Sequence, residues 1–140
     1  MKNSFLLCAV YGFALSLLIL SHHLSPLLLD LFVAQPATLG THTMVWMNWH
    51  AIGCAFVGLI NAQALGWTDA KARRSVAMAS VGIYGIWCAQ NFAYSLSPLF
   101  TSLMWLHVAG CGASALASAS FVVRGDSTGT ASTPPARYTA

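Results

Sequence analysis

The sequence contains four apolar runs that are each long enough to cross a lipid bilayer as a helix. They cover about residues 4–20, 44–65, 75–94 and 99–123, and none of them contains Asp, Glu, Lys or Arg. Because the runs are continuous rather than alternating and about 20 residues long, they fit spanning helices and not barrel strands. The chain has only six basic and three acidic residues, too few to cover a water-soluble domain. We therefore predict an all-α membrane protein, a four-transmembrane-helix bundle embedded in the lipid bilayer.

The basic residues predict which end of this bundle faces the cytoplasm. With four spans, all six Lys and Arg residues fall on the same side. The positive-inside rule then places both termini in the cytoplasm, in a plasma membrane or a bacterial inner membrane. Residues 1–123 form the transmembrane domain, and 124–140, which are mostly small and polar, are predicted to be a disordered cytoplasmic tail. The sparse basic residues give no signal for nucleic-acid binding.

Two eight-residue segments share the pattern Met-x-x-His-x-x-Gly-Cys. The first copy spans 47–54, in the second run, and the other spans 104–111, in the fourth run. A similar match joins Val-Tyr-Gly at 10–12, in the first run, to Ile-Tyr-Gly at 83–85, in the third. We therefore predict two duplicated helical hairpins in parallel orientation. The third run cannot be a signal peptide, so we expect its counterpart at the start to be retained as a span.

The histidines of the repeat, His50 and His107, are predicted to lie in the outer half of the bundle. A titratable group inside a membrane span is by default a functional-site hypothesis. In an up-down-up-down bundle the second and fourth helices are diagonal, so the two imidazoles would face each other across the core. The sharpest prediction is a b-type haem with both histidines as axial ligands, and with Gly53 and Gly110 leaving room for the macrocycle.

This use of two diagonal helices resembles the membrane cytochromes b, at these two histidine positions alone. Such proteins commonly carry a second histidine pair lower in the bundle, and this sequence has none. The resemblance therefore implies at most one haem and no transmembrane electron path within this chain.

The repeat also offers the ligands of a copper site. Thioether, imidazole and thiolate groups favour Cu(I), although Met and Cys are also ordinary packing residues of apolar helices. The cysteines are expected one turn below the histidines, so that one ion would not easily reach all six groups. The candidate metal ligands are Met47, His50, Cys54, Met104, His107 and Cys111.

Other polar residues of the outer half suggest a pocket for a lipid, a quinone or another hydrophobic small molecule. Apolar walls with a few imidazole and amide groups are typical of such sites, whether catalytic or not. The chain has no Glu, and its three Asp residues fall in expected loops or the tail, so no catalytic carboxylate is expected inside the bundle. The candidate pocket residues are Gln90, Asn91, His22, His23, His42 and Asp30.

A structural role without any bound group is the remaining interpretation. Each histidine would then hydrogen-bond a neighbouring helix, for instance through Gln90 or Asn91, in a subunit of a larger membrane partner. Motifs for nucleotide binding, Ser-His-Asp catalysis and zinc fingers are absent from the sequence. The residues are compatible with an enzyme, a binding protein or a structural subunit.

Overall fold

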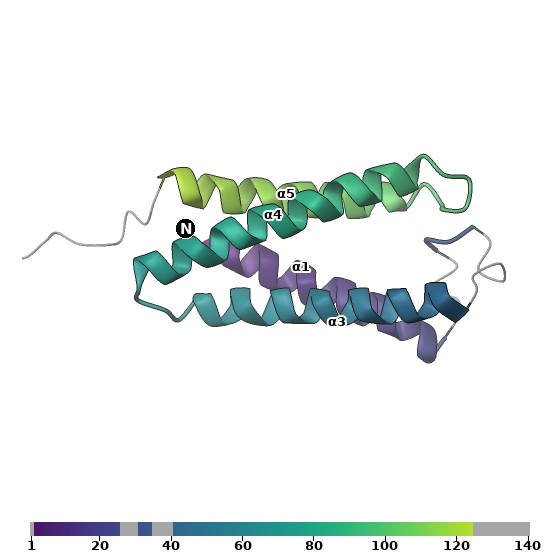
Figure 1. Cartoon of the computed structure of the whole chain (residues 1–140), viewed down its shortest axis with the longest axis horizontal. Coiled ribbons are helices and arrows are strands. Elements are labelled where there is room, and N and C mark those ends of the chain that lie inside the picture. Colours follow the sequence, from purple (N-terminus) through teal and green to yellow (C-terminus); the bar gives the residue numbers. More distant parts are fainter. Residues whose placement is uncertain (1, 26–30, 35–40, 125–140) are drawn as a thin grey trace, which may run out of the picture.

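The computed structural model describes residues 2–25, 31–34 and 41–124 of the 140-residue chain. It confirms the predicted all-α bundle of four long helices (Figure 1). Apart from Arg124, which is the last residue of the fourth long helix, the predicted tail lies outside the described residues. The elements are α1 (Lys2–Leu20), the short 3-10 helix η1 (Ser21–His23), α3 (Thr41–Ala64), α4 (Ala70–Ser95) and α5 (Met104–Arg124).

The helices pack as two hairpins, α1 with α3 and α4 with α5, as the repeat predicts. The hairpins contact each other along α1 and α5 and along α3 and α4, so α3 and α5 are diagonal in the bundle. In Figure 1 the ribbons of α3 and α4 are close beside their connection and separate toward the opposite end. The end at which the ribbons separate carries the connection between α4 and α5 and the segment that leads into α3.

Two of the helices, α4 and α5, begin about five residues from the positions that the sequence indicates. α4 begins at Ala70 rather than near 75, because the Asp69 side chain caps it by accepting a hydrogen bond from the Lys71 backbone N–H at 2.8 Å. α5 begins at Met104 rather than near 99, because the residues before it form turns and a bridge to an earlier segment. The earlier start of α4 makes Arg73 a helical residue.

α1 and α3 approach each other through glycine. A Cβ atom added at Gly12 would lie 2.8 Å from the carbonyl oxygen of Cys54, and one added at Gly58 would lie 3.2 Å from that of Ala9. Real Cβ atoms do not come that close to backbone atoms, so a larger residue at Gly12 would force the helices apart. Small residues at such interfaces allow the backbones of membrane helices to pack directly.

Polar groups join the hairpins near the connection between α3 and α4. The Asn61 Nδ2 atom of α3 donates a hydrogen bond to Ser80 Oγ of α4 at 3.0 Å. Closer to the connection, the guanidinium of the buried Arg73 lies 5.4 Å from the ring centroids of both Phe5 and Phe121. These two rings pack edge to face, 4.9 Å apart. One end of the bundle is therefore closed by packed side chains from α1, α4 and α5.

The outer surface of the bundle is apolar along all four long helices. Two helical segments in the described part of the chain, Asn3–Leu20 and Met104–Arg124, are long and apolar enough to cross a membrane. α3 and α4 do not meet the same criterion, since they contain polar residues such as His50 and Asn61 in α3 and Arg73 in α4. Each long helix has at least one large apolar side chain with 61% to 71% of its surface exposed, for example Leu17, Phe56, Ile86 and Leu116.

Candidate functional site

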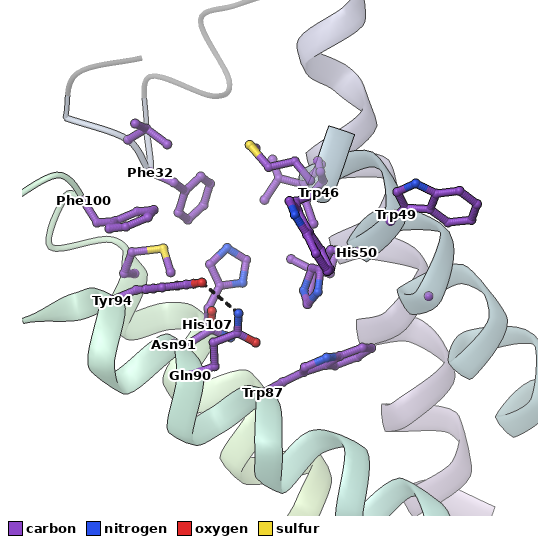
Figure 2. Close-up of a pocket in the computed structure, with 17 residues that line it drawn as sticks. Phe32, Trp46, Trp49, His50, Trp87, Gln90, Asn91, Tyr94, Phe100 and His107 are labelled. Atoms are coloured by element: carbon purple, nitrogen blue, oxygen red, sulfur yellow. Dashed lines mark hydrogen bonds between the residues drawn. The ribbon is translucent and has the colours of Figure 1, made fainter. Parts of the chain in front are cut away.

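A cavity of about 560 Å³ lies between the hairpins, at the end where they separate (Figure 2). All four long helices contribute to its lining, together with the two connecting segments at this end. Among the described residues that line it there is no Lys, Arg, Asp or Glu, so its polar groups are imidazole, amide, phenol and indole. Its aromatic residues are Phe32, Trp46, Trp49, Trp87, Tyr94 and Phe100.

Two backbone hydrogen bonds hold the connecting segments together beside the cavity. The Ala34 N–H donates to the Leu99 carbonyl at 2.8 Å, and the Thr101 N–H donates to the Phe32 carbonyl at 2.9 Å. The first outer connection is thereby fixed to the connection between α4 and α5. As a result, Phe32 and Phe100 line the cavity from two segments that are far apart in the sequence.

His50 of α3 and His107 of α5 both line this cavity. Figure 2 shows their rings on the cavity wall, carried by the two separated hairpins. The His50 ring packs against the Trp87 ring, with centroids 4.9 Å apart, and the His107 ring packs against the Phe32 ring at 4.7 Å. The structure therefore brings the two histidines of the repeat to one site.

Tyr11 of α1 is the closest polar partner of His107, and sequence reasoning missed this role. Its hydroxyl oxygen lies 3.2 Å from the His107 carbonyl oxygen, 3.3 Å from His107 Nδ1 and 3.5 Å from Cys111 Sγ. The Tyr-Gly match between the first and third runs was a signal that these tyrosines have a specific place. It could not indicate which side chain each of them contacts.

The two glycines of the repeat have different surroundings. A Cβ atom added at Gly110 would lie 2.3 Å from Cε2 of the Tyr11 ring, so this ring occupies the space beside the glycine. At Gly53, which lines the cavity, no atom lies within 4 Å of an added Cβ. Gly53 therefore borders open space, as a bound macrocycle would need, whereas Gly110 accommodates a tyrosine.

The sulfur-containing residues of the repeat divide into two groups. Met47 and Met104 line the cavity with the histidines. Cys54 and Cys111 are fully buried in the bundle and are not part of the lining. Within the described residues, no group of three or more His, Cys, Asp or Glu side chains is placed to hold a metal ion.

The amides of α4 line the cavity, but their hydrogen bonds go to other partners. Gln90 Nε2 donates to the Tyr94 hydroxyl at 2.8 Å, and Asn91 Nδ2 donates to Cys111 Sγ at 3.6 Å. In the part of the chain that the structure describes, neither amide hydrogen-bonds a histidine.

Of the other candidate polar residues, His23 has a described side chain, which is not part of this lining. His23 Nε2 lies 3.1 Å from Asn48 Oδ1 in an exposed contact between η1 and α3. The side chains of His22 and His42, and Asp30 as a whole, lie outside the described residues.

Comparisons of the chain with protein families, with curated protein sequences and with solved structures found no match. What the cavity binds therefore has to be inferred from the residues that line it.

Proposed function

We propose that the chain is a membrane-spanning haem protein, in which a b-type haem occupies the cavity with His50 and His107 as its axial ligands. The observation that carries this proposal is that two histidines from diagonal helices line a single apolar cavity. Imidazole is a usual axial ligand of haem iron, and bundle cores are usual places for such cofactors. The iron would serve as a one-electron redox centre.

The cavity volume favours a haem over a single copper ion. Small-molecule sites commonly enclose about 300–1,000 Å³, and the 560 Å³ measured here falls in this range and far exceeds the space that one ion occupies. A copper site in the cavity would have Met47, His50, Met104 and His107 as its candidate ligands, because the thiols of the repeat are buried outside the lining. Cys111 Sγ, for example, already contacts Tyr11 and Asn91 in the core.

The exposed surface supports a lipid environment for all four long helices. Only 33% of Asn3–Leu20 and 22% of the most apolar stretch of Met104–Arg124 is buried inside the bundle. A core helix of a soluble protein is mostly buried. Polar side chains such as Asn61 and Ser80 lie inside the bundle, and apolar ones cover its outside. This distribution is the one that lipid requires.

The orientation follows from the charged residues. Lys71, Arg73, Arg74 and Arg124 all belong to the end opposite the cavity, which the positive-inside rule assigns to the cytoplasm. Both termini would then be cytoplasmic, and the cavity would lie in the outer half of a plasma membrane or a bacterial inner membrane. The equivalent places of His50 and His107 on the second helix of each hairpin also support an origin by duplication.

A second candidate occupant is a neutral hydrophobic molecule such as a quinone or a lipid. The absence of charged groups from the described lining favours an uncharged ligand, and the imidazole and amide groups would supply its few hydrogen bonds. The cavity would then be a binding site without a prosthetic group.

Absorption spectroscopy of the detergent-purified protein, made with abundant haem and copper, tests these proposals. We expect a sharp α-band after dithionite reduction, which the variant with both His50→Ala and His107→Ala would lack. The control His23→Ala changes a histidine outside the cavity and should keep the band. Stoichiometric copper in a sample without the α-band would show that the protein binds copper and not haem. If neither is present, the haem proposal fails, and a quinone or lipid identified by mass spectrometry of the extract would support the second candidate.

A further inference from the structure

The contacts of the Tyr11 hydroxyl favour one position for the proton of His107. A tyrosine hydroxyl has one proton to donate, and a backbone carbonyl can only accept. The contact of 3.2 Å to the His107 carbonyl therefore uses the Tyr11 proton. For the contact of 3.3 Å to Nδ1 to be a hydrogen bond as well, Nδ1 must carry the proton and donate it to the tyrosine oxygen.

The contacts of Cys111 agree with this assignment. Asn91 Nδ2 donates to Cys111 Sγ, so the thiol proton is available to the Tyr11 oxygen, which lies 3.5 Å away. The tyrosine oxygen then accepts from both the imidazole Nδ1 and the thiol, one for each of its lone pairs. Every contact in this group is thus a hydrogen bond with one donor and one acceptor.

A neutral imidazole with its proton on Nδ1 has a lone pair on Nε2. Because His107 lines the cavity, this nitrogen is the one that can donate electrons to a bound group. Histidines that bind metal ions commonly have their other ring nitrogen held by a hydrogen bond, which orients the ring and makes it a better ligand. His107 has this support before any ligand is present.

His50 has no equivalent support among the described residues. Its ring makes an edge-to-face contact with Trp87, and no described side chain hydrogen-bonds it. Tyr84, which matches Tyr11 in the repeat, donates its proton to the Cys8 carbonyl at 2.7 Å instead. The sequence repeat is therefore symmetric, but the supports of its two histidines are not.

We propose that Tyr11 is a positioning residue that makes His107 the permanent ligand of the cavity, while His50 is the exchangeable one. This inference rests on the proposed haem. With a ferrous haem bound, His107 would stay attached, and His50 would be the residue that a small neutral molecule such as carbon monoxide could replace, without a change in oxidation state. The site would then bind a diatomic ligand and not only transfer electrons.

The first experiment needs no haem. In haem-free protein with ¹⁵N-labelled histidine, the ring nitrogen shifts identify the tautomer of His107, whose signals are assigned by their loss in His107→Ala. We expect a proton on Nδ1 in the natural protein and a loss of this preference in Tyr11→Phe. Tyr84→Phe is the matched control, since it removes another interhelical tyrosine hydroxyl and should leave the His107 signals unchanged. A proton on Nε2 in the natural protein would overturn the role of Tyr11.

The second experiment titrates hemin into the full-length protein and its variants. We expect His107→Ala to lose hemin binding and His50→Ala to retain it, with a five-coordinate high-spin spectrum. Tyr11→Phe should weaken binding by about 10- to 100-fold, as removal of a supporting hydrogen bond does at metal sites. Carbon monoxide should shift the spectrum of the reduced natural protein.

The outcomes of the two experiments separate the proposals. The exchangeable role of His50 would be overturned if both histidine variants lost hemin binding to the same extent. It would also be overturned if carbon monoxide did not shift the absorption spectrum of the reduced natural protein. If the natural protein binds no hemin at all, the proposed function and the exchange at iron both fail, whereas the tautomer measurement still decides whether Tyr11 positions His107.

Discussion

Gly53 and Gly110 show how residues at matched positions of a repeat can have different functions in the folded chain. Gly53 lines the cavity with open space beside it, whereas Gly110 lies against the ring of Tyr11. The hydrogen bonds between Tyr11 and His107 depend on this close approach. At the scale of single residues, the structure thus distinguishes two positions that the sequence pattern treats as equal.

An alanine at each of these two glycines should therefore have a different effect on stability. We expect Gly110→Ala to lower the free energy of unfolding by about 1–3 kcal/mol, because the added methyl group must displace Tyr11. Gly53→Ala should be neutral or stabilising by up to about 1 kcal/mol, since alanine is the better helix former. Chemical denaturation in detergent, followed by circular dichroism, measures both. Equal effects of the two substitutions would contradict the position of the Tyr11 ring.

Arg73 and Arg74 form a second pair in which neighbours in sequence have different surroundings. Arg73 is buried against the rings of both Phe5 and Phe121, whereas Arg74 is exposed. Each cation–π contact stabilises by about 0.5–2 kcal/mol, so Arg73→Ala should lower the unfolding free energy by about 1–3 kcal/mol. Arg74→Ala should change it by less than about 0.5 kcal/mol. Comparable losses in the same denaturation assay would show that the contacts of Arg73 with these two rings do not stabilise the fold.

At the scale of elements, the hairpin of α1 and α3 depends on the close approach of its two backbones. Gly12 faces backbone atoms of α3, which cannot move away without shifting the helix. The two hairpins are in contact at the α3–α4 connection and separate at the other end. A tight hairpin is therefore needed on each side of the cavity to keep its walls in place.

Gly12→Ala is expected to destabilise this hairpin. Its Cβ atom would lie 2.8 Å from the Cys54 carbonyl oxygen, which corresponds to a loss of about 1–3 kcal/mol from overpacking. Gly82→Ala in α4 is the matched control, because no atom lies within 4 Å of its added Cβ. The melting temperature in detergent should fall for the first variant and not for the second. A fall of equal size in both would contradict the packing of α1 on α3.

At the scale of the whole molecule, large apolar side chains are found on the outside of the bundle as well as in its core. Asn61, Ser80 and Ser118 are buried, and large apolar side chains cover the outside of each long helix. The hydrophobic effect cannot favour such a surface in water, and lipid is the solvent that suits it. In the proposed topology, the basic residues at one end would determine the orientation in the membrane.

The proposed topology can be tested with one added cysteine on each side. Thr68→Cys lies in the connection between α3 and α4, and Ser102→Cys in that between α4 and α5, both at exposed positions. In right-side-out vesicles, a membrane-impermeant maleimide should label Ser102→Cys directly and Thr68→Cys only after permeabilisation. Labelling of the protein without an added cysteine gives the background from its own free cysteines. The opposite labelling pattern would reverse the orientation.

The number of long helices and the position of the histidines in one half of the bundle could be predicted from the sequence. Hydropathy and the helical period are local properties, so residues close in the chain are sufficient to indicate them. The start of α4 was misjudged by a few residues, because one side chain, Asp69, decides it through a capping hydrogen bond.

Tertiary structure alone decided which groups meet at the cavity. Tyr11 and His107 are 96 residues apart, and their contact depends on the rotation of α1 and α5 and on the small residue at Gly110. The same holds for the separation of the hairpins and for the segment that carries Phe32 to the cavity. The sequence by itself determined that this chain forms four helices with an imidazole in each hairpin. The packing of those helices determined that the two imidazoles share one cavity and that only His107 has a tyrosine beside it, since packing depends on long-range fit and not on local pattern.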